Sequence, residues 1–326
     1  MRNKLVVYSL AIIFCVVAVM ISTDAKAAYP EKPIEFVVHS DAGGGSDLFS
    51  RTIANILETE GLVKQKITVN NRTGGSGTVA MNYMADQTGN PYVLMQFTTG
   101  PINAILRGST KMKLEDVTFL PMMTIDANLA FARTESKYNN MKEIIEFARK
   151  NPNGVSVAYG TVGGSEHICS HRIEKATGVK LNKVGFGGGG PAAVAMLGGH
   201  VDFAFGNLEE QMGQIEAGKV KVLGTMTPER IALMPNVSTM IEQGINASYL
   251  QPRGFWAPKN FPDDAVKFWE ETLYKLYNNK KFQEYLKKSY AEGSFMKSAE
   301  TKAYMIEFVK ELSVDVDELG AFKKKK

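Results

Sequence analysis

One local pattern recurs along the chain: a short apolar run, a glycine-rich loop, and a stretch with apolar residues at helical spacing. Ile34 to Val38 is such a run and stops at Asp41-Ala-Gly-Gly-Gly45. Leu48, Phe49, Ile53, Ile56 and Leu57 then recur at intervals of three and four until Gly61. This order predicts a strand, a glycine loop and a helix.

The same unit returns through most of the sequence. Further strands are predicted at residues 67–69, 92–97, 155–159, 183–186, 201–205 and 220–226. Helices are predicted over 141–149, from 165 to Gly178, after Pro191, and through the last 60 residues with a break at Gly293. Alternating strands and helices predict an α/β, doubly wound fold with a mainly parallel sheet in each of two lobes. Ligands of such sheets bind where strand ends meet helix starts.

Length and composition fit this fold. The 326 residues suffice for about two domains. With 44% hydrophobic and 22% charged residues, the chain is neither disordered nor a multi-span membrane protein. None of its 30 glycines precedes residue 43, and most gather in clusters.

The N-terminus has the three parts of a secretory signal. A basic start, Met1 to Lys4, precedes the uncharged stretch Leu5 to Ile21, and Ala25-Lys26-Ala27 supplies a cleavage step. We expect residues 1–27 to be a signal peptide and the mature protein to reach the periplasm. A membrane anchor is the alternative, because 17 residues is near the lower limit for a span.

Charge and cysteine content narrow the function further. Cleavage would remove three positive residues and one negative residue, so the formal charge falls from +4 to +2. Four of the remaining positive residues form the tail Lys323 to Lys326, so the rest of the mature chain has a formal charge of about −2. A body without excess positive charge argues against a nucleic-acid partner. Cys169 is the one cysteine left, which excludes an intramolecular disulfide and suggests a buried apolar position.

The glycine loops predict anion binding, because backbone N–H groups and helix starts favour negative charge there. Gly185 to Gly190 fits a dinucleotide fingerprint, but no acid follows about 20 residues on, so we expect no nucleotide or other cofactor. Taken singly, each loop could also be a tight turn.

The sequence contains few of the residue patterns that are typical of catalytic sites, and we expect that the protein is not an enzyme. His167 and His171 could chelate a metal, but Ile168 stands where a zinc protease has its glutamate, so no metal site is predicted. No Gly-x-Ser-x-Gly elbow is present. Glu209 and Glu210 are interpreted as an exposed helix start.

In this order, the loops resemble the extracytoplasmic receptors of tripartite tricarboxylate transporters, also called Bug receptors. The matching segments cover nearly the whole mature chain: residues 29–34, 42–47 with Arg51, 71–77, 160–167, 187–191, 197–202, 217–220, 229–230, 235–239 and 242–244. Gln251-Pro-Arg-Gly254 resembles the citrate-receptor branch, whereas His39, Ser40, Ser46 and Pro252 depart from the usual pattern.

The resemblance implies a monomeric Venus-flytrap receptor that binds a small carboxylate and passes it to transporter membrane subunits. The ligand would be a dicarboxylate or tricarboxylate such as citrate, or an aromatic carboxylate. A sensor component that presents ligand to a sensor kinase is the alternative, with an α/β hydrolase or a nucleotide-dependent enzyme as weaker ones. Lobe 1 would comprise residues 28–124 and 227–300, lobe 2 residues 125–226, and residues 301–326 a C-terminal helix and tail of unassigned lobe.

The resemblance also implies a ligand clamp from both lobes. Its expected members are glycine-loop residues and a few polar side chains: Gly44, Gly45, Ser46, Asp47, Thr98, Thr99, Thr161, Gly163, Ser165, His167, Gly188, Gly189, Gly190 and Arg253. Because Asp47 would repel a carboxylate, capping of its own helix is the alternative role for this residue. Arg253 would suit a bidentate carboxylate contact or a salt bridge between the lobes.

Overall fold

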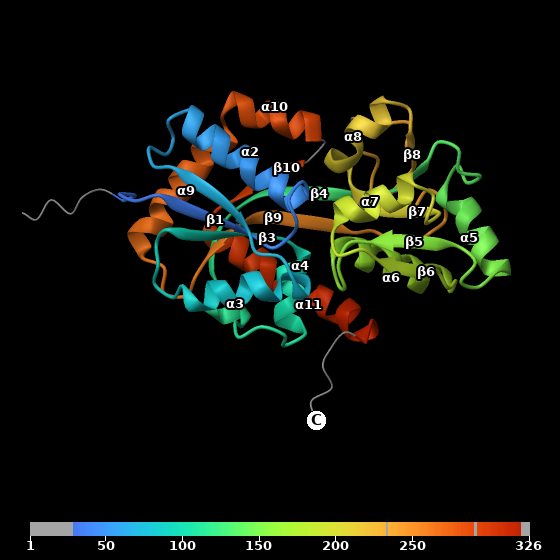
Figure 1. The fold of residues 1–326 in the computed structure, drawn as a ribbon, viewed down its shortest axis with the longest axis horizontal. Helices are drawn as coiled ribbons and strands as arrows, with labels where there is room; N and C mark the ends of the chain where they lie inside the picture. Colours follow the sequence, from blue (N-terminus) through green and yellow to red (C-terminus); the bar gives the residue numbers. More distant parts are fainter. Residues whose placement is uncertain (1–28, 233, 290–291, 321–326) are drawn as a thin grey trace, which may run out of the picture.

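The computed structural model describes residues 29–232, 234–289 and 292–320. Strands and helices alternate along this part of the chain and build one mixed sheet in two portions (Figure 1). The strand order is β2-β1-β3-β9-β4-β7-β5-β6, with β8 and β10 also paired to β4. The architecture confirms the predicted α/β fold class.

The first portion, sheet A, has three parallel strands at its outer edge. Strand β1 pairs in parallel with β2 and β3, and β9 runs antiparallel to β3. The strands are β1 (Ile34–Val38), β2 (Ile67–Asn71), β3 (Val93–Phe97), β9 (Leu250–Ala257) and β10 (Glu292–Met296). The helices around them are α2 (Gly45–Thr59), η1 (Gly75–Gly77), α3 (Thr78–Asp86), α4 (Thr99–Leu106), η2 (Leu114–Asp116), α9 (Asp263–Tyr277), α10 (Lys280–Ser289) and α11 (Ser298–Glu318).

The second portion, sheet B, repeats the parallel arrangement. Strand β5 pairs in parallel with β6 and β7. Its strands are β5 (Ser156–Tyr159), β6 (Asn182–Gly185), β7 (Phe203–Asn207) and β8 (Val220–Thr225). Its helices are α5 (Met141–Lys150), α6 (Ser165–Thr177), α7 (Gly189–Leu197) and α8 (Leu208–Glu216). The cluster of apolar residues predicted for α2 packs on sheet A, since Phe49, Ile53 and Leu57 are buried in the same core as Phe36 of β1.

One long strand joins the two sheets. Strand β4 (Thr118–Arg133) pairs with β9 and β10 through its first half and with β7 and β8 through its second half. A second crossing runs beside it, where Met226 N donates to Asn128 O at 2.8 Å and Tyr249 N donates to Met226 O at 2.7 Å. The pattern of residues predicted neither β4 nor β9. Pro121 in β4 and Pro252 in β9 obscure the strand signal, because proline rarely lies in a central strand.

The segment between β8 and β9 is attached to sheet B. We expected it with the first lobe, but Met240 N donates to Thr225 O at 2.8 Å, and the Gln243 side chain accepts from Met141 N at 2.8 Å. These bonds tie residues up to about Tyr249 to β8 and α5. The chain therefore returns to sheet A only at β9.

Helix α11 contacts elements of both sheets. Near its start, the Thr301 hydroxyl accepts from Met122 N of β4 at 2.9 Å. Near its end, Asp315 forms an ion pair with Arg172 of α6 at 2.7 Å. The break expected at Gly293 is a strand, β10, which pairs with β4. Among the described residues, no helix combines the length and the apolar character needed to cross a bilayer.

Candidate functional site

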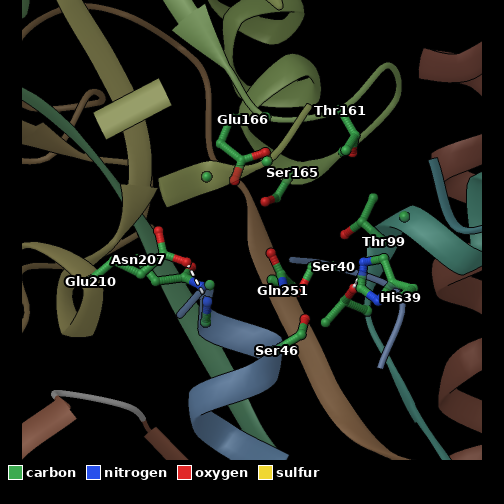
Figure 2. Close-up of a pocket in the computed structure, with 18 of the residues that line it drawn as sticks. His39, Ser40, Ser46, Thr99, Thr161, Ser165, Glu166, Asn207, Glu210 and Gln251 are labelled. Carbon is green, nitrogen blue, oxygen red and sulfur yellow. Dashed lines mark hydrogen bonds between the residues drawn. The ribbon is translucent and has the colours of Figure 1, made fainter. Parts of the chain in front are cut away.

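A small polar cavity lies between the two sheets, where the parallel strands end (Figure 2). His39 and Ser40 follow β1, Thr98 follows β3, and Gly160 and Thr161 follow β5. The cavity volume is about 60 Å³, which is room for about four water molecules. The position is the one that doubly wound sheets use for ligands.

Every side chain that lines the cavity carries a polar group. Its residues are glycines together with hydroxyl, amide, carboxyl, guanidinium and imidazole side chains, and His39 supplies the one ring in the wall. The lining residues are His39, Ser40, Gly44, Gly45, Ser46, Thr98, Thr99, Gly100, Gly160, Thr161, Gly164, Ser165, Glu166, Gly188, Gly189, Asn207, Glu210, Gln251 and Arg253. A ligand here would be recognised by hydrogen bonds and charge rather than by apolar contact.

Three helices begin at this cavity. The N-cap residues of α2, α6 and α7 are Gly44, Gly164 and Gly188, and none has a side chain that caps the helix. No N-cap side chain therefore competes with a ligand for the first N–H groups, and each helix start adds partial positive charge. Gly160 makes room for the third start, because a Cβ on Gly160 would lie 2.8 Å from Gly189 N.

A hydrogen bond across the cavity joins α2 to α8. Gly45 N donates to Glu210 Oε1 at 2.6 Å, so a carboxylate of the chain occupies the start of α2. A Cβ on Gly45 would lie 2.8 Å from Glu210 Oε1 and 2.9 Å from Arg253 Nη2. Glycine at this position lets Glu210 and Arg253 approach the helix backbone.

Arg253 is the cation of the site. It lies on β9, is 1% exposed, and forms an ion pair with Asp126 of β4. Its Nη1 atom has no hydrogen-bond partner among the described residues. The Arg253 side chain also lines the cavity, where a guanidinium group can donate charge-assisted hydrogen bonds to a ligand oxygen.

Two glutamates flank the start of α7. A Cβ on Gly189 would lie 3.1 Å from Glu210 Oε2 and 3.5 Å from Glu166 Oε1. Burial, together with the neighbouring charge of Glu210, raises the pKa of Glu166 to about 7. Burial also raises the pKa of Glu210. Both effects arise because a carboxylate loses hydration here.

The structure places most of the expected clamp around one cavity. Ten of the fourteen residues line it: Gly44, Gly45, Ser46, Thr98, Thr99, Thr161, Ser165, Gly188, Gly189 and Arg253. The other four, Asp47, Gly163, His167 and Gly190, do not line it. Both halves of the expected clamp thus contribute to the cavity wall, one from each sheet.

Asp47 is engaged with its own helix start. Its carboxylate accepts from Gly43 N and from Arg51 Nε, each at 2.9 Å, and from Asn71 Nδ2 at 2.9 Å. These bonds fit the alternative role of a helix cap. They leave Asp47 on the loop side of α2.

The two histidines of α6 do not converge. The His167 ring stacks on Tyr159 with centroids 4.3 Å apart, and its Nδ1 accepts from Gly163 N at 3.1 Å. His171 is paired with Glu318 of α11 at 3.0 Å. Although donor atoms of His171, Asp315 and Glu318 lie within 4.8 Å of one another, the two carboxylates already pair with Arg172 and Lys175.

The sequence analysis missed several residues of the cavity wall. The interpretation of Glu209 and Glu210 as an exposed helix start is wrong, because both are half-buried and Glu210 lines the cavity. Its position could have been inferred, since α8 follows β7 without a loop and its first turn must face the strand-end edge. His39 and Ser40, which the sequence marked as departures from the family pattern, also line the cavity, and the other missed residues are Gly100, Gly160, Gly164, Glu166, Asn207 and Gln251.

A two-part α/β sheet, crossed by long strands and holding a polar cavity at the strand ends, is the architecture of periplasmic binding proteins. The structure of the periplasmic binding protein BugD matches with a TM-score of 0.82 and 25% identity, covering 91% of this chain and 100% of that chain. The structure of an R. palustris protein, Rpa4515, solved with adipate matches with a TM-score of 0.84 and 21% identity, covering 90% of this chain and 98% of that chain.

Sequence comparison gives the family. The model of the tripartite tricarboxylate transporter family receptor matches residues 50–320. A Cupriavidus necator protein, "UPF0065 protein in gbd 5'region", is 26% identical over 300 residues, which is 90% of each chain. The chain belongs to the tripartite tricarboxylate transporter receptor family, whose members are binding proteins and not enzymes.

Proposed function

We propose that this receptor binds a small carboxylate outside the cytoplasmic membrane and delivers it to the membrane subunits of a tripartite tricarboxylate transporter. One observation carries the proposal: three helix starts and the guanidinium side chain of Arg253 meet at a single polar cavity. Each helix start contributes about 0.3–1 kcal/mol to anion binding, and up to about 2 kcal/mol when partly buried. Micromolar affinity needs about 8 kcal/mol, so charge-assisted hydrogen bonds must supply the remainder.

The polar wall favours a short aliphatic ligand over an aromatic one. Among the lining residues, only His39 has a ring that could stack on an aromatic carboxylate. The R. palustris protein of this fold holds adipate, an aliphatic dicarboxylate.

The placement in the citrate-receptor branch remains part of this proposal. It rests on Gln251-Pro-Arg-Gly254, of which Gln251 and Arg253 line the cavity. We propose further that the two sheets with their helices are the closing lobes and that the ten cavity-lining residues of the expected clamp contact the ligand. The expected signal peptide, residues 1–27, lies outside the described residues and completes the proposal by directing export.

Thermal-shift screening of residues 28–326 tests the function. The panel contains mono-, di- and tricarboxylates, sugars and nucleotides, and we expect stabilisation by small carboxylates alone. Ser165→Ala should weaken that binding several-fold because Ser165 lines the cavity, whereas Ser313→Ala on α11 should leave it unchanged. Shifts with sugars or nucleotides and none with carboxylates would refute the proposed function. Uptake of the ligand should also stop when the genes of the transporter membrane subunits are deleted, whereas a sensor would leave uptake intact.

A further inference from the structure

The charges around the cavity do not balance. Arg253 is the one cation in the wall and is already paired with Asp126, which lies outside the wall. Two carboxyl groups, Glu166 and Glu210, line the cavity, and within the described part of the chain neither forms an ion pair, although the charge of Arg253 acts on both. Since an unpaired buried carboxylate is costly, each requires a proton or an external cation.

The unpaired side-chain amides of the wall add further acceptors. Oδ1 of Asn207 and Oε1 of Gln251 are buried and have no hydrogen-bond partner among the described residues. Gln251 is only 4% exposed, so solvent cannot satisfy its oxygen. Figure 2 shows Glu166 and Gln251 on two sides of the same space, with Asn207 and Glu210 beside it. This side of the cavity therefore offers acceptors that lack a donor.

Acidic side chains of the protein already lie at the helix starts. Glu210 accepts from Gly45 N at the start of α2. Glu166 lies in the first turn of α6, and its Oε1 is near the start of α7. A second carboxylate of a ligand would have to enter beside these two negative groups, and like charges at short range oppose one another.

We propose that Glu166 and Glu210, together with the amide oxygens of Asn207 and Gln251, form an ammonium site, so that the ligand is a small amino-substituted carboxylate. The ligand carboxylate faces the guanidinium group of Arg253, and its ammonium group donates to the acidic side. An ammonium group has three donors and no acceptor, which suits two carboxyl groups without an ion pair and two amide oxygens without a donor. This inference rests on the proposed function and ranks amino-substituted ligands above citrate.

Calorimetric titration with matched ligand pairs tests the inference on the unmodified receptor. The pairs are succinate and aspartate, glutarate and glutamate, and adipate and 2-aminoadipate, with malate and citrate for comparison. Members of a pair differ only by the amino group, so skeleton length and carboxylate number are controlled. We expect the amino member of the best-fitting pair to bind at least tenfold more tightly than its partner.

Variants then assign the effect to residues. Glu166→Gln and Glu210→Gln should each remove most of the preference for the amino member, mainly by weakening that member. Glu216→Gln, on the exposed end of the same helix α8, should leave the preference unchanged. Thermal unfolding of each variant shows whether it is folded, and the pairwise comparison on the unmodified protein holds even if a variant fails.

Three results would overturn the inference. The first is that succinate, glutarate, adipate or citrate binds as tightly as the amino-substituted ligands or more tightly, and that Glu166→Gln or Glu210→Gln strengthens this binding. Glu166 and Glu210 would then repel the ligand carboxylate rather than bind an ammonium group. The second is citrate binding that requires Mg²⁺, which would assign the acids to a metal complex. In both cases the carboxylate-receptor function stands. Absence of binding by every carboxylate, the third result, refutes the function as well.

Discussion

Two loops of the chain carry the same short sequence and use it differently. Gly44 to Asp47 and Gly163 to Glu166 both read Gly-Gly-Ser-acid, and each leads into a helix that starts at the cavity, one on each sheet. Helix α2 begins at the second glycine, so Asp47 is its third residue; α6 begins at the serine, so Glu166 is its second. This offset of one residue directs the two carboxylates to different sides of their helix starts.

The residue one turn later completes the contrast. Four residues after Asp47 is Arg51, which pairs with it, whereas four residues after Glu166 is Ser170, whose hydroxyl donates to His167 O. Burial alone would raise the pKa of Asp47, but the hydrogen bonds from Arg51, Gly43 and Asn71 lower it below its ordinary value. The pKa of Glu166 instead rises to about 7. The same motif thus gives a self-capped helix in one loop and an acidic cavity wall in the other.

The largest effect is expected from blocking the α2 start. In Gly45→Ala, the new Cβ would lie 2.8 Å from Glu210 Oε1 and 2.9 Å from Arg253 Nη2, so both side chains must shift. Because Glu210 and Arg253 both line the cavity, we expect their displacement to weaken ligand binding by roughly 5- to 150-fold, which is about 1–3 kcal/mol. Titration calorimetry measures the loss. Gly213→Ala in α8, where a Cβ meets nothing within 4 Å, is the matched control and should bind normally.

An intermediate effect is expected from Asp47→Ala, and it should fall on stability. The change removes a helix cap that holds Gly43, Arg51 and Asn71, so the free energy of unfolding should drop by about 1–2 kcal/mol. Urea unfolding measures this drop. Ligand affinity should change less than in Ser165→Ala. A variant of ordinary stability that has lost its ligand would place Asp47 in the binding site and remove the contrast between the loops.

The smallest effect is a difference in pH dependence. A carboxyl with a folded-state pKa of about 7 and an ordinary value of 4.5 keeps its proton in the folded protein while the unfolded chain loses it. Stability therefore falls as the pH rises from about 4.5 to about 7, and the penalty persists above that range. Glu166→Gln should lessen this fall by something on the order of 1 kcal/mol. Thermal unfolding between pH 5 and pH 8 measures it; parallel curves for the variant and the parent would contradict the raised pKa.

The regular parts of the fold could be predicted from the sequence because their signals are local. The run Ile34 to Val38 is β1 as observed, and Met141 to Arg149 falls within α5. The crossing strands could not be predicted in the same way. Pro121 in β4 and Pro252 with Gly254 in β9 are atypical of central strands, and pairing between residues more than 100 positions apart stabilises both strands.

The sequence predicted that the glycine loops form the site, but it did not predict that Glu166 and Glu210 line the cavity. Gly44, Gly164 and Gly188 mark helix starts that local pattern can locate. The direction of Glu166 and Glu210 depends on a one-residue offset in the helix start and on how the two sheets face each other. Those are properties of tertiary packing, so the polarity of the cavity emerges only from the structure.

Strand β4 has a consequence for how the molecule melts. Its 16 residues belong to sheet A through one half and to sheet B through the other, and α11 also contacts elements of both sheets. Because β4 is one continuous strand, unfolding of either sheet also disturbs a central strand of the other sheet. Chains of two domains commonly unfold in separate steps. Here a single cooperative transition is expected, with equal calorimetric and van't Hoff enthalpies, even though the ligand cavity divides the chain into two halves.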